Sequence, residues 1–316
     1  MKLAVVIPAF NEEEAIGRVI KSIPKVNKRI SSTEVIVVDD GSTDRTVSIA
    51  KESGALVVSH HGNKGVGKAF QTGIETALKR RADVIVNIDA DGQFNPLDIP
   101  QLISPILDNK ADFVTATRFK DGKMIGKMPF VKLVGNKIFT ALTSMLVGKK
   151  FTDTQCGFRA YSREAALRLN LYGTFTYTQE VFLDLANKGM RIMEVPLYVR
   201  AERANGKSRV VKSIPFYVFQ ALQIMIRAVR DYKPLAFFGV IGGFVFGLGV
   251  LIEGILFVRW LITGNISPFR TAVLAAGVVI ILGFLLLILA LIADMLDRQR
   301  RIQEDILYYR KKGAMK

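Results

Sequence analysis

The chain has 316 residues, a formal net charge of +16 and a mean hydropathy of +0.27. Half of its residues are apolar although 23% are charged, a combination that indicates two kinds of sequence in one chain and excludes disorder, collagen and a disulfide scaffold. The single cysteine, Cys156, excludes an internal disulfide and fits a reducing compartment. The positive charge by itself points to nucleic acid, a membrane surface or a phosphorylated substrate as partner.

Strand-like and helix-like segments alternate through the first part of the chain. Strand-like runs lie at 3–8, 34–39, 55–59, 83–89 and 112–117, and amphipathic stretches lie near 12–22, 43–53 and 65–80. This order predicts an α/β fold with a Rossmann-like, mostly parallel sheet that carries helices on both faces. Ligands of such sheets bind outside the carboxyl ends of the strands, so the polar residues that follow each strand are the candidates for function.

Three of these strand ends are rich in polar side chains. The first is followed by PAFNEE at 8–13, the second ends in DDGSTD at 39–44, and the fourth ends in NIDADGQ at 87–93. In an extended chain Asp89 and Asp91 point their carboxylates to the same side, and Gln93 adds a further oxygen after a turn at Gly92. Such an oxygen-rich group is suited to Mg²⁺ or Mn²⁺, with coordination positions left for phosphate oxygens.

The segment GNKGVGKA at 62–69 has two interpretations. It presents backbone N–H groups and positive charge to a diphosphate, or it is a plain helix start. It is not a P-loop, because Ala69 follows Lys68 where that motif needs Ser or Thr. The only two histidines, His60 and His61, have no spacing that suggests a metal site, and we expect them in a loop or at a strand edge.

The apolar excess lies near the C-terminus. The segments 235–258 and 271–293 contain a single charged residue, Glu253. Both are long enough to cross a hydrocarbon core of about 30 Å, at about 1.5 Å per residue; the alternative is a pair of buried core helices. Before them, 209–232 has apolar residues at helical spacing and is expected to lie in the membrane interface or, alternatively, to pack on the soluble part.

Basic residues flank both apolar segments, and the positive-inside rule therefore places the N-terminal region and the C-terminal tail in the cytoplasm. The predicted organisation is a soluble domain over 1–208, an amphipathic interfacial helix over 209–232, two transmembrane helices within 233–296 and a basic tail over 297–316. Because two spans present little surface inside a membrane, we also expect a homo-oligomer.

Three quoted motifs carry a family resemblance. VIPAFNEE, VVDDGSTD and DADGQ, in this order, resemble those of family 2 glycosyltransferases with the GT-A fold. Further motifs narrow the resemblance, namely ATRF at 116–119, DTQCGFRAYS at 153–162, TYTQE at 176–180, EVP at 194–196 and RANGKS at 203–208. Together with the two spans, they are similar to polyprenyl-phosphate glycosyltransferases such as the dolichyl-phosphate mannose and glucose synthases.

The resemblance implies an inverting transfer of a hexose from GDP-mannose, UDP-glucose or UDP-GlcNAc to dolichyl or polyprenyl phosphate. The product would be a lipid-linked sugar donor for glycan or protein glycosylation. The expected partners are thus a nucleotide-diphospho-sugar, a polyprenyl phosphate and membrane lipids, and no nucleic acid.

The resemblance also implies residue roles. The nucleotide-sugar pocket would be lined by Pro8, Ala9, Asn11, Glu12, Asp40, Lys64 and Asp89. A Mg²⁺ or Mn²⁺ cofactor would be held by Asp89, Asp91 and Gln93, and the lipid phosphate by Arg118, Lys132, Arg203, Lys207 and Ser208. The implied catalytic residues are Asp91, Arg118 and Asp153, with Glu180 facing the acceptor or the sugar. Lys132 and Asn136 stand where mannose synthases more usually have Arg and Ser, which leaves the donor sugar open.

The chemistry of the acceptor favours cations over a base. A phosphate monoester with a second pKa near ~6 is mostly a dianion at neutral pH, so it needs positive charge beside the donor diphosphate more than it needs deprotonation. Asp153 is therefore read first as a positioning residue and second as a base, Cys156 as a packing residue, and Arg203 and Lys207 as phosphate ligands or, alternatively, as a solvated basic loop.

Two other functions remain to be weighed against this one. A processive polysaccharide synthase is expected to have more spans and a Gln-x-x-Arg-Trp motif, whereas Arg259-Trp260 lacks the Gln. A basic membrane scaffold uses the +16 charge but gives no reason for the acidic strand ends.

Overall fold

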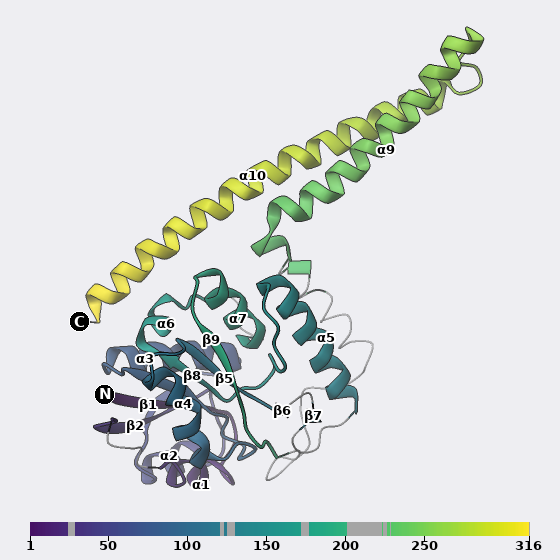
Figure 1. Ribbon diagram of the computed structural model, residues 1–316. Coiled ribbons are helices and arrows are strands. Elements are labelled where there is room, and N and C mark those ends of the chain that lie inside the picture. The colour runs from purple at the N-terminus through teal and green to yellow at the C-terminus, as the bar shows by residue number, and fades with distance from the viewer. Residues whose placement is uncertain are drawn as a thin grey trace. The chain divides into compact units, whose positions relative to one another are not determined.

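The computed structural model describes residues 1–24, 29–120, 123–124, 130–171, 177–200, 223, 226–227 and 229–315. It divides into two compact units: a sheet unit of residues 1–218 and 307–316, and a hairpin unit of residues 219–306 (Figure 1). Most of the amphipathic helix predicted at 209–232 lies outside the described residues, and its last part, 229–232, is helical.

The sheet unit contains the predicted α/β fold. Its main strands are β1 (Lys2–Ala9), β2 (Ser32–Asp39), β3 (Leu56–Ser59), β4 (Val84–Asn87), β5 (Phe113–Thr117), β8 (Arg159–Ser162) and β9 (Ile192–Pro196). They form one sheet in the order β3-β2-β1-β4-β8-β5-β9. Within this sheet β8 runs antiparallel to its neighbours β4 and β5, and the other pairs are parallel, so the prediction of a mostly parallel sheet is confirmed.

Helices cover the sheet. They are α1 (Ile16–Lys21), α2 (Thr46–Glu52), α3 (Val66–Lys79), a 3₁₀ turn η1 (Pro96–Asp98), α4 (Ile99–Leu107), α5 (Phe130–Val147), α6 (Arg163–Arg168) and α7 (Tyr177–Asn187). A separate short hairpin is made by β6 (Phe119–Lys120) and β7 (Lys123–Met124). The three amphipathic stretches read from the sequence correspond to α1, α2 and α3.

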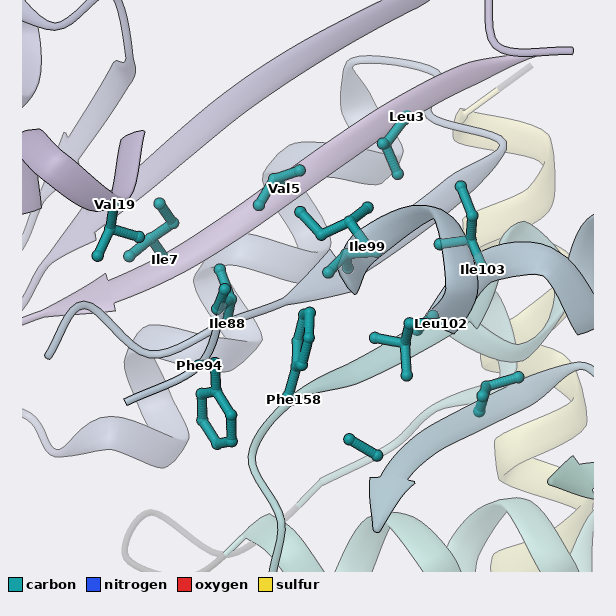
Figure 2. Close-up of a cluster of buried hydrophobic side chains, with 14 of the residues drawn as sticks. Leu3, Val5, Ile7, Val19, Ile88, Phe94, Ile99, Leu102, Ile103 and Phe158 are labelled. Atoms are coloured by element: carbon teal, nitrogen blue, oxygen red, sulfur yellow. The ribbon is translucent and has the colours of Figure 1, made fainter. Parts of the chain in front are cut away.

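The core has two layers because successive residues of a strand point to opposite faces. Leu3, Val5 and Ile7 of β1 join one buried cluster with Ile99 and other residues of α4, which Figure 2 shows. The intervening Ala4 and Val6 join a second cluster on the opposite face, together with residues of α3 such as Phe70. Burial on both faces explains why β1 reads as a continuous apolar run.

The hairpin unit contains the apolar helix α9 (Pro234–Thr263) and the part of helix α10 (Arg270–Ala314) up to Ile306, which includes its apolar stretch. Both are long and apolar enough to cross a membrane, and only 11% and 17% of their most apolar windows are buried, unlike core helices of a soluble protein. The two helices pack closely, since a Cβ added to Gly283 of α10 would lie 2.5 Å from the Cα of Phe246 in α9. Within α9, the Oε2 atom of Glu253 is buried and has no hydrogen-bond partner among the described residues.

Helix α10 extends well beyond the predicted end of the second span. The segment predicted as a basic tail is helical to Ala314, and its last residues belong to the sheet unit. There Tyr308 is 5% exposed and its hydroxyl lies 3.0 Å from a carboxylate oxygen of Glu164. Lys311 donates from Nζ to the carbonyl oxygen of Leu169 and to Oδ1 of Asn170. The C-terminus is thus a packed part of the sheet unit.

Candidate active site

The carboxyl ends of the parallel strands meet at one edge of the sheet, and the loops that follow them are joined by hydrogen bonds. After β1, the backbone N–H of Asn11 donates to the Ser42 hydroxyl at 2.9 Å, and its side-chain oxygen accepts from the N–H of Thr43 at 2.9 Å. The N–H of Glu12 donates to the Thr46 hydroxyl at 2.8 Å. The predicted nucleotide residues Asn11 and Glu12 therefore lie against the loop that follows β2, beside Pro8 and Ala9 at the end of β1.

Asp40, one of the residues predicted to line the nucleotide-sugar pocket, is buried and accepts several hydrogen bonds. Its Oδ1 accepts from the backbone N–H of Lys64 at 2.9 Å and lies 2.8 Å from Nδ1 of His60, and its Oδ2 accepts from the N–H of Gly65 at 2.8 Å. The neighbouring Gly41 has a φ of +82° and lies so close to Gly62 that a Cβ would clash at 2.8 Å. Asp40 thus joins the end of β2 to the glycine-containing turn before α3.

The acidic pair predicted to hold a metal follows β4. The strand ends at Asn87, earlier than predicted, so Asp89 and Asp91 lie in the turn beyond it. Asp91 is 5% exposed, and its Oδ1 accepts from the N–H of Gln93 at 3.0 Å across the turn at Gly92, which has a φ of +73°. The carboxylate of Asp89 lies against Gly157, where an added Cβ would be 2.9 Å from Oδ2.

Asp153, which lies in the same loop as Gly157, forms a buried ion pair with Arg118. Nε of Arg118 lies 2.6 Å from Oδ2 of Asp153 and Nη2 lies 2.8 Å from Oδ1, a two-pronged arrangement. The Asp153 side chain is fully buried, whereas that of Arg118 is 22% exposed. Asn136 of α5 donates from Nδ2 to Oδ1 of Asp153 at 2.7 Å. Asp153 therefore has its oxygens filled by donors and is shielded from a substrate, while Arg118 reaches the surface.

The electrostatics of this pair disfavour a base. Burial alone raises the pKa of Asp153, but the hydrogen bonds and charge of Arg118, with the hydrogen bond from Asn136, outweigh burial and hold it below the ordinary value. Burial likewise opposes the charge of Arg118, and Asp153 outweighs it, so the pKa of Arg118 is raised. The positioning role of Asp153 stays a prediction, and the donors around its buried carboxylate favour that role over the role of a base.

Two further residues hold this loop, and the sequence indicated neither role. Glu194 of β9 accepts from the N–H of Thr152 at 2.8 Å and from that of Asp153 at 2.8 Å. Arg159 is fully buried and donates to the carbonyl oxygens of Cys156 and Thr154 at 2.7 and 2.9 Å. Glu194 lies in the motif EVP at 194–196, and Arg159 lies in the motif DTQCGFRAYS at 153–162. The sequence therefore indicated both motifs but not the hydrogen-bond partners of these two residues.

Cys156 is a packing residue, as predicted from the sequence. Its thiol is buried, and burial raises its pKa to about 12, which disfavours a thiolate at neutral pH.

Several predicted ligands of the lipid phosphate are beyond what the structure describes. Arg203, Lys207 and Ser208 lie outside the described residues, and so does the side chain of Lys132 in α5. The last described residue before Arg203 is Arg200, whose N–H donates to the carbonyl oxygen of Gln93 at 3.1 Å, and Nε2 of Gln93 donates to the carbonyl oxygen of Arg200 at 3.3 Å. Glu180 lies in the first turn of α7.

The donor set after β4 fits a divalent cation of the magnesium or manganese type. Among the described residues no cluster of three or more His, Cys, Asp or Glu side chains is found. Two carboxylates, Asp89 and Asp91, are hard oxygen ligands that leave coordination positions for a diphosphate and water, which is how Mg²⁺ is usually bound. Nε2 of Gln93 donates to the carbonyl oxygen of Arg200 at 3.3 Å, and its amide oxygen is the atom of the side chain that is of the type that ligates such a cation.

Comparison with known proteins finds a matching family model and relatives that are named as sugar transferases or synthases. The family model described as Glycosyl transferase family 2 matches residues 4–169. A UDP-N-acetylglucosamine–dolichyl-phosphate N-acetylglucosaminyltransferase of Methanococcus voltae is 33% identical over 238 residues, 67% of this chain and 92% of the relative. A dodecaprenyl-phosphate galacturonate synthase of Rhizobium johnstonii is 28% identical over 313 residues, 94% of this chain and 88% of the relative.

A solved structure shares the fold. Glucosyl-3-phosphoglycerate synthase from Mycobacterium tuberculosis, crystallised with Mn²⁺, uridine diphosphate and glucosyl-3-phosphoglycerate, superposes with a TM-score of 0.54 and 28% identity. The match covers 71% of this chain and 79% of that one. The sheet is thus that of the GT-A fold, and the family model covers more than half of the chain, from β1 through β8. The chain belongs to glycosyl transferase family 2.

Proposed function

We propose that the protein transfers a hexose from a nucleoside diphosphate sugar to a polyprenyl phosphate such as dolichyl phosphate, with inversion at the sugar carbon. The relatives named above as a dolichyl-phosphate N-acetylglucosaminyltransferase and a dodecaprenyl-phosphate galacturonate synthase support this substrate class. They differ in the sugar, so the donor stays among GDP-mannose, UDP-glucose and UDP-GlcNAc. The lipid-linked sugar would then serve glycan or protein glycosylation.

One observation carries the proposal: the loop 152–158 lies against Asp89 of the predicted metal site near one end and holds the cation of Arg118 near the other. Gly157 lies against the carboxylate of Asp89, and Asp153 holds the guanidinium of Arg118. Such a loop brings a site for a metal-bound diphosphate beside a site for a second phosphate. This is the arrangement that joining two polyanionic substrates requires.

The donor is proposed to bind along the ends of β1, β2 and β4. Pro8, Ala9, Asn11, Glu12, Asp40 and Lys64 would line the nucleotide, and Asp89, Asp91 and Gln93 would hold Mg²⁺ or Mn²⁺. The chemistry that a divalent cation held by these residues would supply is stabilisation of the charge on the leaving diphosphate.

The acceptor phosphate is proposed to lie on Arg118. Asp153 engages two of the five N–H groups of the guanidinium, so the others are left to face the phosphate. One phosphate oxygen of the acceptor attacks the anomeric carbon, the bond from that carbon to the donor diphosphate breaks, and the nucleoside diphosphate leaves. Because the acceptor is already an anion, no proton has to be removed. A single displacement of this kind inverts the configuration.

The lipid acceptor explains the two apolar helices. We propose that α9 and α10 span the membrane and that the sheet unit and the C-terminus lie together in the cytoplasm, as the basic flanks indicate. Residues 307–315, which follow the proposed second span, belong to the sheet unit, and this supports placing both on one side of the membrane. A homo-oligomer in the membrane remains part of this proposal.

The test uses the purified full-length protein, polyprenyl phosphate, Mg²⁺ or Mn²⁺ and a panel of labelled GDP- and UDP-sugars. One donor is expected to give a lipid-linked sugar, and Asp91→Asn is expected to abolish its formation while the protein keeps its fold by circular dichroism. Growth of a long polysaccharide would favour the processive synthase, and no transfer with any donor would favour a scaffold.

A further inference from the structure

His60 follows β3 and is one of only two histidines in the chain. Its side chain is 7% exposed, whereas the neighbouring His61 is exposed. Nδ1 of His60 lies 2.8 Å from Oδ1 of Asp40, and Nε2 lies 3.0 Å from the hydroxyl of Thr72 in α3. The transfer step described above makes no use of this buried imidazole.

The imidazole fixes a carboxylate that organises a turn. A carboxylate oxygen accepts hydrogen bonds, so Nδ1 of His60 carries the hydrogen that it shares with Asp40. The same carboxylate accepts from the N–H groups of Lys64 and Gly65, in the turn that opens α3. His60 therefore ties together the end of β2, the end of β3 and helix α3.

Loss of the imidazole would release one side of Asp40. The Asp40 side chain is only 5% exposed, so without a rearrangement water cannot replace the lost hydrogen-bond donor. A buried carboxylate that has lost a donor tends to rotate toward another donor or to draw in solvent. Either response moves the N–H groups of Lys64 and Gly65, since these donate to the same carboxylate. The turn at 62–65 and Asp40 would then leave the positions in which they meet a nucleotide.

We propose that His60 is a positioning residue of the nucleotide pocket, which sets Asp40 and, through it, the turn at 62–65. This inference rests on the proposed nucleoside diphosphate sugar donor but not on the lipid acceptor. Its effect is therefore expected on the donor side of the reaction alone.

The first experiment measures binding of UDP and GDP, with Mn²⁺, to the full-length protein by calorimetry. His60→Ala is expected to weaken the better-bound nucleotide by about tenfold or more, the loss of one hydrogen bond to a charged group. His60→Asn, whose side-chain N–H replaces that of Nδ1, is expected to recover most of the affinity. His61→Ala is the matched control and is expected to bind as the wild type, and the KM for polyprenyl phosphate is expected to stay unchanged in all three.

A second measurement does not depend on the folding of any His60 variant. With ¹⁵N-labelled histidine the chain gives two imidazole ring systems, which His61→Ala assigns. Nucleotide is expected to shift the signals of His60 and to leave those of His61 in place.

The inference is overturned if His60→Ala binds nucleotide as tightly as the wild type, or if it lowers only the melting temperature. It is also overturned if neither UDP nor GDP binds the wild type or if nucleotide leaves the His60 signals unmoved. Weakened nucleotide binding in His60→Ala, together with no transfer to polyprenyl phosphate by the wild type, would instead refute the proposed acceptor and leave the role of His60 standing.

Discussion

The ion pair between Asp153 and Arg118 gives the sharpest prediction. Asp153→Asn keeps the shape of the side chain but turns one acceptor oxygen into an NH₂ group. Nε of Arg118 binds Oδ2 and Nη2 binds Oδ1, so in either orientation the new NH₂ faces a guanidinium N–H. The variant therefore creates a donor–donor conflict inside a buried site and leaves the charge of Arg118 without its partner.

The size of the effect follows from burial. Removing one partner of a buried ion pair costs about 3–5 kcal/mol, and since Arg118 is 22% exposed, water compensates in part. We expect a loss of about 2–4 kcal/mol in the free energy of unfolding of the sheet unit. The KM for polyprenyl phosphate is expected to rise by about tenfold or more, because Arg118 loses its fixed orientation.

A double-mutant cycle separates positioning from base catalysis. The cycle measures kcat/KM for polyprenyl phosphate in the wild type, Asp153→Asn, Arg118→Ala and the double variant. If Asp153 acts through Arg118, Asp153→Asn adds little, less than about threefold, once Arg118 is absent. A general base contributes about 10²–10⁴ on its own, so an undiminished loss in the Arg118→Ala background would refute the positioning role.

Three further predictions test other parts of the structure. Tyr308→Ala is expected to lower the free energy of unfolding of the sheet unit by about 2–4 kcal/mol and its melting temperature by about 6–12 °C, because Tyr308 is only 5% exposed. Tyr309→Ala serves as the control, since Tyr309 is 69% exposed. Equal shifts for both variants would contradict the packing of the end of α10 on the sheet unit. Gly157→Ala is expected to weaken Mn²⁺ binding in the presence of UDP by about tenfold, since the new Cβ lies 2.9 Å from Oδ2 of Asp89. Gly313→Ala, whose new Cβ has no atom within 4 Å, is the control and is expected to leave the Mn²⁺ affinity unchanged. Unaltered Mn²⁺ affinity in Gly157→Ala would remove Asp89 from the metal site. The pKa of Asp153 is lowered in the folded state, so its stabilisation is complete above the ordinary value near ~4 and is lost as the pH falls through the folded pKa. Denaturant unfolding of wild type and Asp153→Asn should therefore differ by a constant amount from about pH 8 to 5 and converge below that; convergence near neutral pH would show that the pKa is raised instead.

The sequence predicted the elements that local patterns determine. The buried strands β1, β2 and β5 are short apolar runs, and the edge that their loops share follows from the βαβ order. The order could not reveal that β8 enters antiparallel between β4 and β5, because its four residues begin with the buried Arg159 and pair only with distant strands.

The contacts inside the site were beyond sequence patterns for the same reason. Arg118 and Asp153 are 35 residues apart and His60 lies 20 residues from Asp40, so no periodicity links them. The segment 297–316 is predicted only as a basic tail, because its many charged residues obscure a helical pattern of apolar residues. In the structure those charges form pairs along α10, such as Asp297 with Arg301 and Asp294 with Arg298.

Mass spectrometry of the lipid product tests most directly whether the protein transfers a sugar to the phosphate of a polyprenyl lipid. With the cognate nucleotide sugar and a divalent cation, we expect a polyprenyl lipid with one phosphate and one hexose, together with an equal amount of released nucleoside diphosphate. A lipid with two phosphates and released nucleoside monophosphate, or release of nucleoside diphosphate without any glycosylated lipid, would refute the proposed transfer.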